Sequence, residues 1–287
     1  MNDFDDHVRS LSRLHGLIEA DPAQGADAAA KELAEDIAAT AGKIREDAEA
    51  VVSRIHAEAQ SVSVRLQAET SKSVENLKKE SLRAASDLIR DGKGDASEKD
   101  NARAANRIIE DANKALNLLN KKIEDSLKAL AEDADSTAFK FNRIAESENR
   151  KLTDLERDAA QQVADAGKEA AARFPKPSDD ESWNDSELQQ ARLASAGVIK
   201  ALALAADMVH RATAEATRKI QEASEDAALF MKKASAKATG EINTAIDEAN
   251  STILQAAEQA LKDLAGDEET EFFDLAPLKE KWGKRKT

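Results

Sequence analysis

An eleven-residue repeat between Ala194 and Leu264 constrains this chain more than any other feature of its sequence. An alanine stands four residues before each large apolar residue of the repeat, and a second alanine stands three residues after nearly all of them. Eleven residues fill three helical turns at about 3.67 residues per turn, slightly looser than a free α-helix. The repeat therefore predicts a long helix whose apolar seam runs nearly straight or coils gently right-handed. The large residues are Val198, Val209, Ile220, Met231, Ile242, Ile253 and Leu264.

Two earlier stretches of the chain carry large apolar residues at the same spacing. We predict that all three columns form the seam along which helices assemble, within the chain or between copies of it. The first column is Leu33, Ile44, Ile55, Leu66, Leu77 and Leu88, and the second is Ile108, Leu119, Leu130, Phe141, Leu152, Val163 and Phe174.

Helix-breaking residues separate the three stretches. Asp21 and Pro22 suit the N-cap and first position of a helix. Two glycines between Asp91 and Asp95 end the first helix, and the prolines after Phe174 end the second. Ser97 with Asp100, and Ser186, are candidate N-caps of the later helices, and Gly266 is a candidate C-cap. The sequence therefore predicts helices over about 22–90, 97–174 and 186–265.

These signals predict an all-α protein built from three very long helices. Short connections between helices of similar length favour antiparallel neighbours, so we expect an elongated antiparallel bundle over residues 21–265. At a rise of about 1.5 Å per residue, each helix would be roughly 100–120 Å long. In a competing layout one hairpin opens, and helices pair between chains.

The two ends of the chain depart from the repeat. Residues 1–20 are predicted to form a short amphipathic segment that either caps the bundle or docks into a partner's groove. Residues 266–287 are acidic, then aromatic, then basic, and they either cover the bundle end or act as a linear docking motif. The candidate docking residues are Phe4, Val8 and Leu11 at one end, and Phe272, Phe273, Leu275 and Trp282 at the other.

Composition argues against several classes of function. A net charge of −14 disfavours nucleic acid and anionic membranes as main partners. Aromatic residues are only 3% of the chain and cysteine is absent, so the sequence predicts neither a thick core nor thiol chemistry. The four histidines, His7, His15, His56 and His210, lack metal-ligand spacing, and no phosphate loop or nucleophile motif occurs. We expect a non-enzymatic protein without a cofactor or metal.

The N-terminus has no apolar signal core, which together with the absence of cysteine favours a cytoplasmic location. The longest apolar run, Val198–Val209, is interrupted by Lys200 and Asp207, and we interpret it as a buried turn of helix rather than a membrane span. Beside the seam, Ile220 and Ile242 are expected in helix contacts, whereas Lys219 and Glu241 are expected on the outer face.

The period and composition resemble several groups of proteins. The repeat is similar to the hendecad coiled coils of rotary ATPase stalks and bacterial cytoskeletal rods, to the lipid-surface repeats of apolipoproteins and lipid-droplet coats, and to late-embryogenesis proteins. A stripe of alanine with one large residue per repeat favours a rod over a lipid-surface helix. We therefore expect a scaffold or filament subunit that associates with itself, with an apolipoprotein- or phasin-like granule coat as the alternative.

Overall fold

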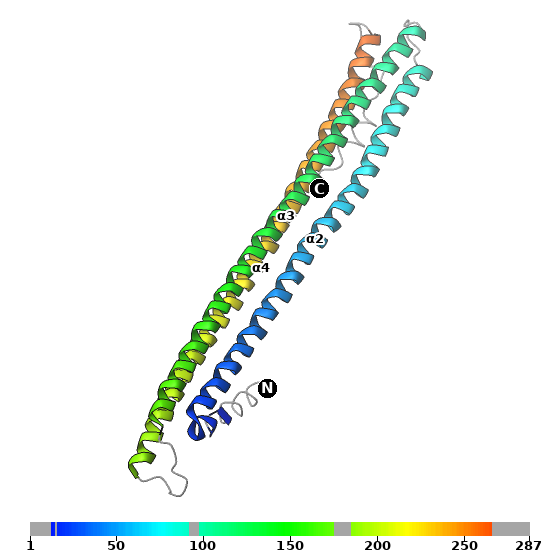
Figure 1. The fold of residues 1–287 in the computed structure, drawn as a ribbon. Helices are drawn as coiled ribbons and strands as arrows, with labels where there is room; N and C mark the ends of the chain where they lie inside the picture. Colours follow the sequence, from blue (N-terminus) through cyan, green and yellow to red (C-terminus); the bar gives the residue numbers. More distant parts are fainter. Residues whose placement is uncertain (1–12, 15, 92–97, 175–184, 266–287) are drawn as a thin grey trace. The chain divides into compact units, whose positions relative to one another are not determined.

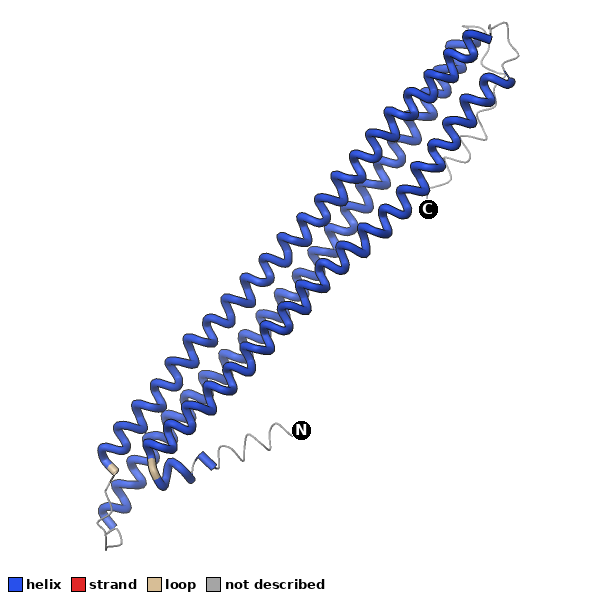
Figure 2. The backbone as a smooth tube through the Cα atoms, turned by 45° about the vertical axis from the view of Figure 1, so that its right-hand side comes forward, coloured by secondary structure: helices blue, strands red, loops and turns tan. Residues whose placement is uncertain are grey.

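The computed structural model describes residues 13, 14, 16–91, 98–174 and 185–265. These residues are helical almost throughout, and no strand occurs among them (Figure 2). The prediction of an all-α protein is therefore confirmed. The long helices, labelled in Figure 1, are α2 (Pro22–Asp91), α3 (Glu98–Arg173) and α4 (Asp185–Ala265).

The helix starts test the predicted caps. The backbone N–H groups of Ala23 and Gln24 both donate to Oδ1 of Asp21 at 3.1 Å, which confirms Asp21 as the N-cap of α2. The prediction for Ser186 is wrong, because α4 begins at Asp185 and Ser186 lies in its first turn. Two acidic residues in that turn, Asp185 and Glu187, complement the positive end of the helix dipole. The predicted caps Ser97 and Gly266 lie outside the described residues.

The chain divides into two compact units, and each contains a part of α2, α3 and α4. The first unit comprises Met1–Arg54 and Ala138–Ala227, and the second comprises Ile55–Thr137 and Ala228–Thr287.

In the first unit, the described part of the N-terminal segment packs onto the long helices. Ile18 is fully buried, and its carbonyl oxygen accepts a hydrogen bond from Oγ of Ser195 in α4 at 3.2 Å. Gly25 makes this packing possible, because a Cβ there would lie 2.6 Å from the backbone of Ile18. A similar close approach occurs at Gly167 of α3, where a Cβ would lie 2.4 Å from Cβ of Ala26 in α2. Both glycines are therefore required by contacts between segments.

In the second unit, α3 and α4 run in opposite directions. Arg107 of α3 forms an ion pair with Asp263 of α4 at 2.6 Å. Lys122, later in α3, pairs with Glu248, which comes earlier in α4. A core cluster near these contacts includes Leu88 of α2 and Ile108 of α3. It also includes Ala257 and Ala260 of α4, whose small side chains let helices approach closely.

Within the second unit, the buried face of α2 is partly polar. Thr70, Ser73 and Ser81 are buried there, and each hydroxyl donates to a carbonyl oxygen of α2 itself. Their polar atoms are satisfied, yet these bonds do not link α2 to another helix. Apolar burial by Leu66 and Leu77 therefore contributes most to holding this part of α2 in place.

Candidate interaction surfaces

The structure places the predicted seam residues in the interior of the single chain. Leu264 is half-buried against the core cluster of the second unit, Phe174 at the end of the second column is also half-buried, and all the other predicted seam residues are buried. The fully buried side chains include Phe141, Leu152 and Met231. Because these side chains are already packed within one chain, contacts between copies would have to use other surfaces.

Two residues expected on the outer face instead contact a neighbouring helix. Lys219 is half-buried and its Nζ lies 3.6 Å from Oε2 of Glu148 in α3. The carboxylate of Glu241 accepts a hydrogen bond from Oγ of Ser126 at 3.1 Å. The outer-face prediction is therefore wrong for Lys219, whereas Glu241 is exposed as predicted and also reaches α3. Each lies next to a seam residue, and a long side chain at that position can extend over the seam toward the next helix.

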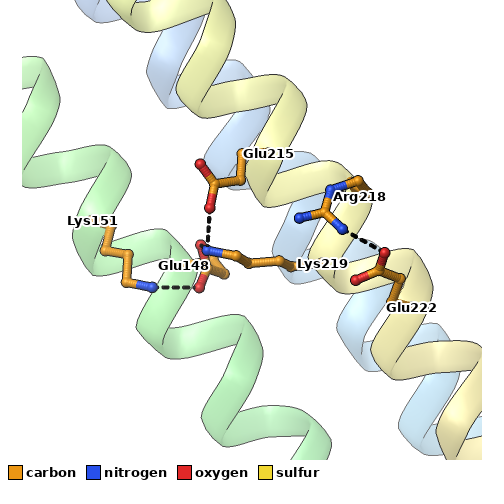
Figure 3. Close-up of polar contacts among 6 residues, drawn as sticks. All are labelled: Glu148, Lys151, Glu215, Arg218, Lys219 and Glu222. Atoms are coloured by element: carbon orange, nitrogen blue, oxygen red, sulfur yellow. Dashed lines mark hydrogen bonds and ion pairs between the residues drawn. The ribbon is translucent and has the colours of Figure 1, made fainter.

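Lys219 belongs to a polar network in the first unit that is centred on Glu148 (Figure 3). The Glu148 side chain is only 8% exposed, and Nζ of Lys151 donates to its Oε1 at 2.6 Å. Lys219 approaches from α4 and also pairs with Glu215 at 2.5 Å. The buried carboxylate therefore has one cationic partner on its own helix and one on α4.

The ion pair between Glu215 and Lys219 shifts both groups toward their charged forms. The hydrogen bond from Lys219 lowers the pKa of Glu215, and the positive charge of Lys219 acts in the same direction. The hydrogen bond to Glu215 raises the pKa of Lys219, and the charge of Glu148 also favours the protonated amine. Lys219 is thus held as a cation beside Glu148 over the whole physiological range.

A sequence signal for Glu148 exists, although our sequence analysis missed it. Four residues before each large residue of the second column there is a buried position, and nearly all of these positions hold small side chains. Glu148 is the charged exception, and a charge in a column of small residues is a candidate for a specific contact. This contact gives α3 and α4 a non-repeating feature within an otherwise repeating seam. The column is Ala104, Ala115, Ser126, Thr137, Glu148, Ala159 and Ala170.

In the first unit, α4 carries large apolar side chains on its exposed face. Leu193 is 68% exposed, Leu204 is 54% exposed and Met208 is 37% exposed. Gly197 lies between them and is also exposed. The spacings of four, seven and four residues place these positions on one stripe of the helix, with Leu193 and Leu204 one repeat apart. We call Leu193, Gly197, Leu204 and Met208 the outer stripe.

The outer stripe corrects our interpretation of the apolar run Val198–Val209. Val198 and Val209 are buried as expected, but Leu204 and Met208 point away from the core. Among the described residues, α4 is the one helix with an 18-residue window apolar enough to cross a membrane by length and composition, and 33% of that window is buried. The run is therefore apolar on two faces, of which only one is explained by packing within the chain.

The described residues contain no group of three or more His, Asp or Glu side chains that could hold a metal ion. Nδ1 of His56 lies 3.6 Å from Oδ1 of Asp135, and His210 is exposed. His7, His15 and all the predicted terminal docking residues lie outside the described part of the chain.

Comparisons with protein-family models, with curated proteins and with solved structures gave no match for this chain.

Proposed function

We propose that this chain is a non-enzymatic structural protein that associates with itself into a filament, lattice or scaffold. In this proposal α2, α3 and α4 form an elongated antiparallel hendecad bundle, in which helices of 70, 76 and 81 residues would be about 105–120 Å long. The bundle would serve as a spacer and its exposed faces as contacts. We place this function in the cytoplasm.

One observation carries the proposal: the large seam residues are buried within the chain, while α4 still exposes an apolar stripe. The buried seam supports a subunit that folds without a partner. Leu193, Leu204 and Met208 lie on one face of a single helix. Exposed apolar residues that are scattered singly over a surface are common in folded proteins, but a group on one face is typical of an interaction site. An exposed apolar stripe on a folded subunit favours association.

The terminal segments would add order to the assembly. A seam that repeats every eleven residues allows neighbouring copies to slip by one repeat at little cost, so non-repeating groups have to set the register between copies. Phe272, Phe273 and Trp282 supply aromatic anchors of the kind that commonly dominate interfaces. In our proposal they dock onto another copy or onto a protein partner.

The test compares the full chain with a variant that lacks residues 267–287, by electron microscopy and sedimentation velocity at equal concentration. We expect the full chain to assemble, and the truncated chain to keep its helical content but lose ordered assembly. The double variant Phe272→Ala/Phe273→Ala should reproduce most of this loss. A full chain that remains monomeric at every concentration would contradict the proposed function, whereas unchanged assembly of the truncated chain would contradict only the role of the tail.

The alternative function is an amphipathic coat on a lipid or polymer granule, with an apolipoprotein- or phasin-like role. The outer stripe favours it, since an apolar surface can also adsorb to a lipid surface. Circular dichroism with and without vesicles separates the two. A coat gains helix on binding vesicles, whereas a scaffold subunit is equally helical and assembled without them.

A further inference from the structure

We propose that the face of α4 that carries the outer stripe pairs with the same face of a second copy, in antiparallel orientation, about a two-fold axis between Ala203 and Leu204. This inference rests on the proposed self-assembly and names the surface at which two copies meet. A two-fold pair brings identical patches together, so this face of α4 has to be complementary to itself. The apolar residues and the charges of the face both meet this requirement.

The apolar part of the stripe suits a close contact between two helices. Leu193 and Leu204 are the most exposed large apolar side chains in the described part of α4, and Gly197 and Ala203 beside them are small and exposed. Small residues next to leucines create hollows, and the leucine of a second helix can enter them. With the axis between Ala203 and Leu204, Leu204 of one copy faces Ala203 of the other, and Leu193 faces Ala214.

The charges on the same face specify an antiparallel arrangement. Lys200 and Asp207 are equally distant from the proposed axis, and so are Arg192 and Glu215. An antiparallel second copy therefore places each basic residue opposite an acidic one. A parallel copy would place Lys200 opposite Lys200 and Asp207 opposite Asp207, which is repulsive. Charge complementarity thus favours a second copy of this chain in one orientation.

The ion pairs within the chain leave Lys200 and Asp207 available for this contact, whereas Glu215 already pairs with Lys219 at 2.5 Å. Among the described residues, neither Arg192 nor Lys200 has an ion-pair partner. Asp207 pairs with Arg211 one turn later at 2.8 Å, and both side chains are more than half exposed. Exposed pairs within a helix contribute only tenths of a kcal/mol, so Asp207 can accept Lys200 of a second copy at small cost.

The first test uses single cysteines in the full chain, which has no cysteine of its own. We expect a short bis-maleimide to cross-link Leu204→Cys with itself, because the axis passes next to this position. Leu193→Cys and Ala214→Cys should each remain uncross-linked alone, since like positions then lie about 30 Å apart along the helices. An equal mixture of these two variants should cross-link. Cross-linking of Leu193→Cys with itself, or no cross-linking of Leu204→Cys, would overturn the proposed pairing.

The second test reverses charges and measures self-association by sedimentation equilibrium. Lys200→Glu and Asp207→Lys should each weaken association roughly tenfold, because each creates two like-charge contacts about the axis. The double variant Lys200→Glu/Asp207→Lys should restore the wild-type affinity, since the contacts become opposite again. Lys232→Glu, an exposed site of the second unit, is the matched control and should change nothing.

These outcomes separate this inference from the proposed function and from lipid binding. Assembly that persists without cross-linking at Leu204→Cys would refute the pairing through the outer stripe but not the proposed function. Cross-linked pairs that never form larger assemblies would support the stripe and contradict a filament or lattice. On vesicles of an anionic phospholipid the two single variants would act in opposite directions, because Lys200→Glu would weaken binding and Asp207→Lys would strengthen it. That pattern, without self-association, would refute the pairing.

Discussion

Lys219→Met tests the contact between α3 and α4 at the buried carboxylate of Glu148. The methionine keeps most of the apolar stem of the lysine and removes its charge. Glu148 then retains Lys151 as a partner at 2.6 Å but loses the cation contributed by α4. We expect the variant to fold and to be less stable than the wild type.

The magnitude follows from the separation and exposure of the pair. Two unit charges 3.6 Å apart interact by roughly 1 kcal/mol in water and by roughly 4–5 kcal/mol at an effective dielectric constant near 20. The Lys219 side chain is 32% exposed, so solvent screening moves the value toward the lower figure. Lys151 remains beside Glu148 and compensates in part. We therefore expect a loss of about 1–2 kcal/mol, or about 2–6 °C in Tm.

Urea unfolding followed by circular dichroism measures this loss, and a double-mutant cycle assigns it. In a Glu148→Ala background, Lys219→Met should cost much less, because only the exposed ion pair with Glu215 is then lost and no buried carboxylate needs the lysine. Lys232→Met at an exposed position is the matched control. If Lys219→Met were equally costly with and without Glu148, the loss would come from packing of the lysine stem, and our electrostatic reasoning would be refuted.

Three further substitutions test the packing and the ion pair. Ala227→Asp should cost about 2–4 kcal/mol of stability, because it puts an unpaired carboxyl at a buried position. Ala228→Asp, at the exposed neighbouring position, should change the stability by no more than about 0.5 kcal/mol. Equal melting temperatures of the two variants would contradict the buried seam. Gly25→Ala should cost about 1–3 kcal/mol of stability, because the new Cβ clashes with Ile18. Gly42→Ala should stabilise the helix, because a Cβ there meets nothing within 4 Å. Thermal melts that rank the two variants in the opposite order would refute the close approach at Gly25. Glu215→Gln should destabilise the protein at pH 7, because the lowered pKa of Glu215 adds stability wherever its carboxyl is ionised. The difference in unfolding free energy from the wild type should shrink as the pH falls below 4.5, the ordinary pKa of a glutamate. A difference that stays constant down to pH 2 in unfolding titrations would contradict this role.

The sequence by itself determined the helical class and the buried side of each helix. Large residues that recur every eleven positions keep the same direction on an α-helix, so the burial of Ile44, Leu130 and Ile242 could be predicted without knowing their neighbours. The N-cap at Asp21 was likewise predictable, because its side chain bonds to backbone groups two and three residues away. These features depend on local geometry alone.

Only the tertiary structure decided what lies across from each seam. Periodicity fixes the direction of a side chain and not the identity of the group it meets, so Lys219 and Glu241 were placed on the outer face although both reach α3. The need for glycine at position 25 arises from Ile18, which a turn of the chain brings onto the helix. The outer stripe also became evident only from the tertiary structure. Leu204 and Val209 are both apolar residues, and only the packing of the helices shows that Leu204 is exposed and Val209 is buried.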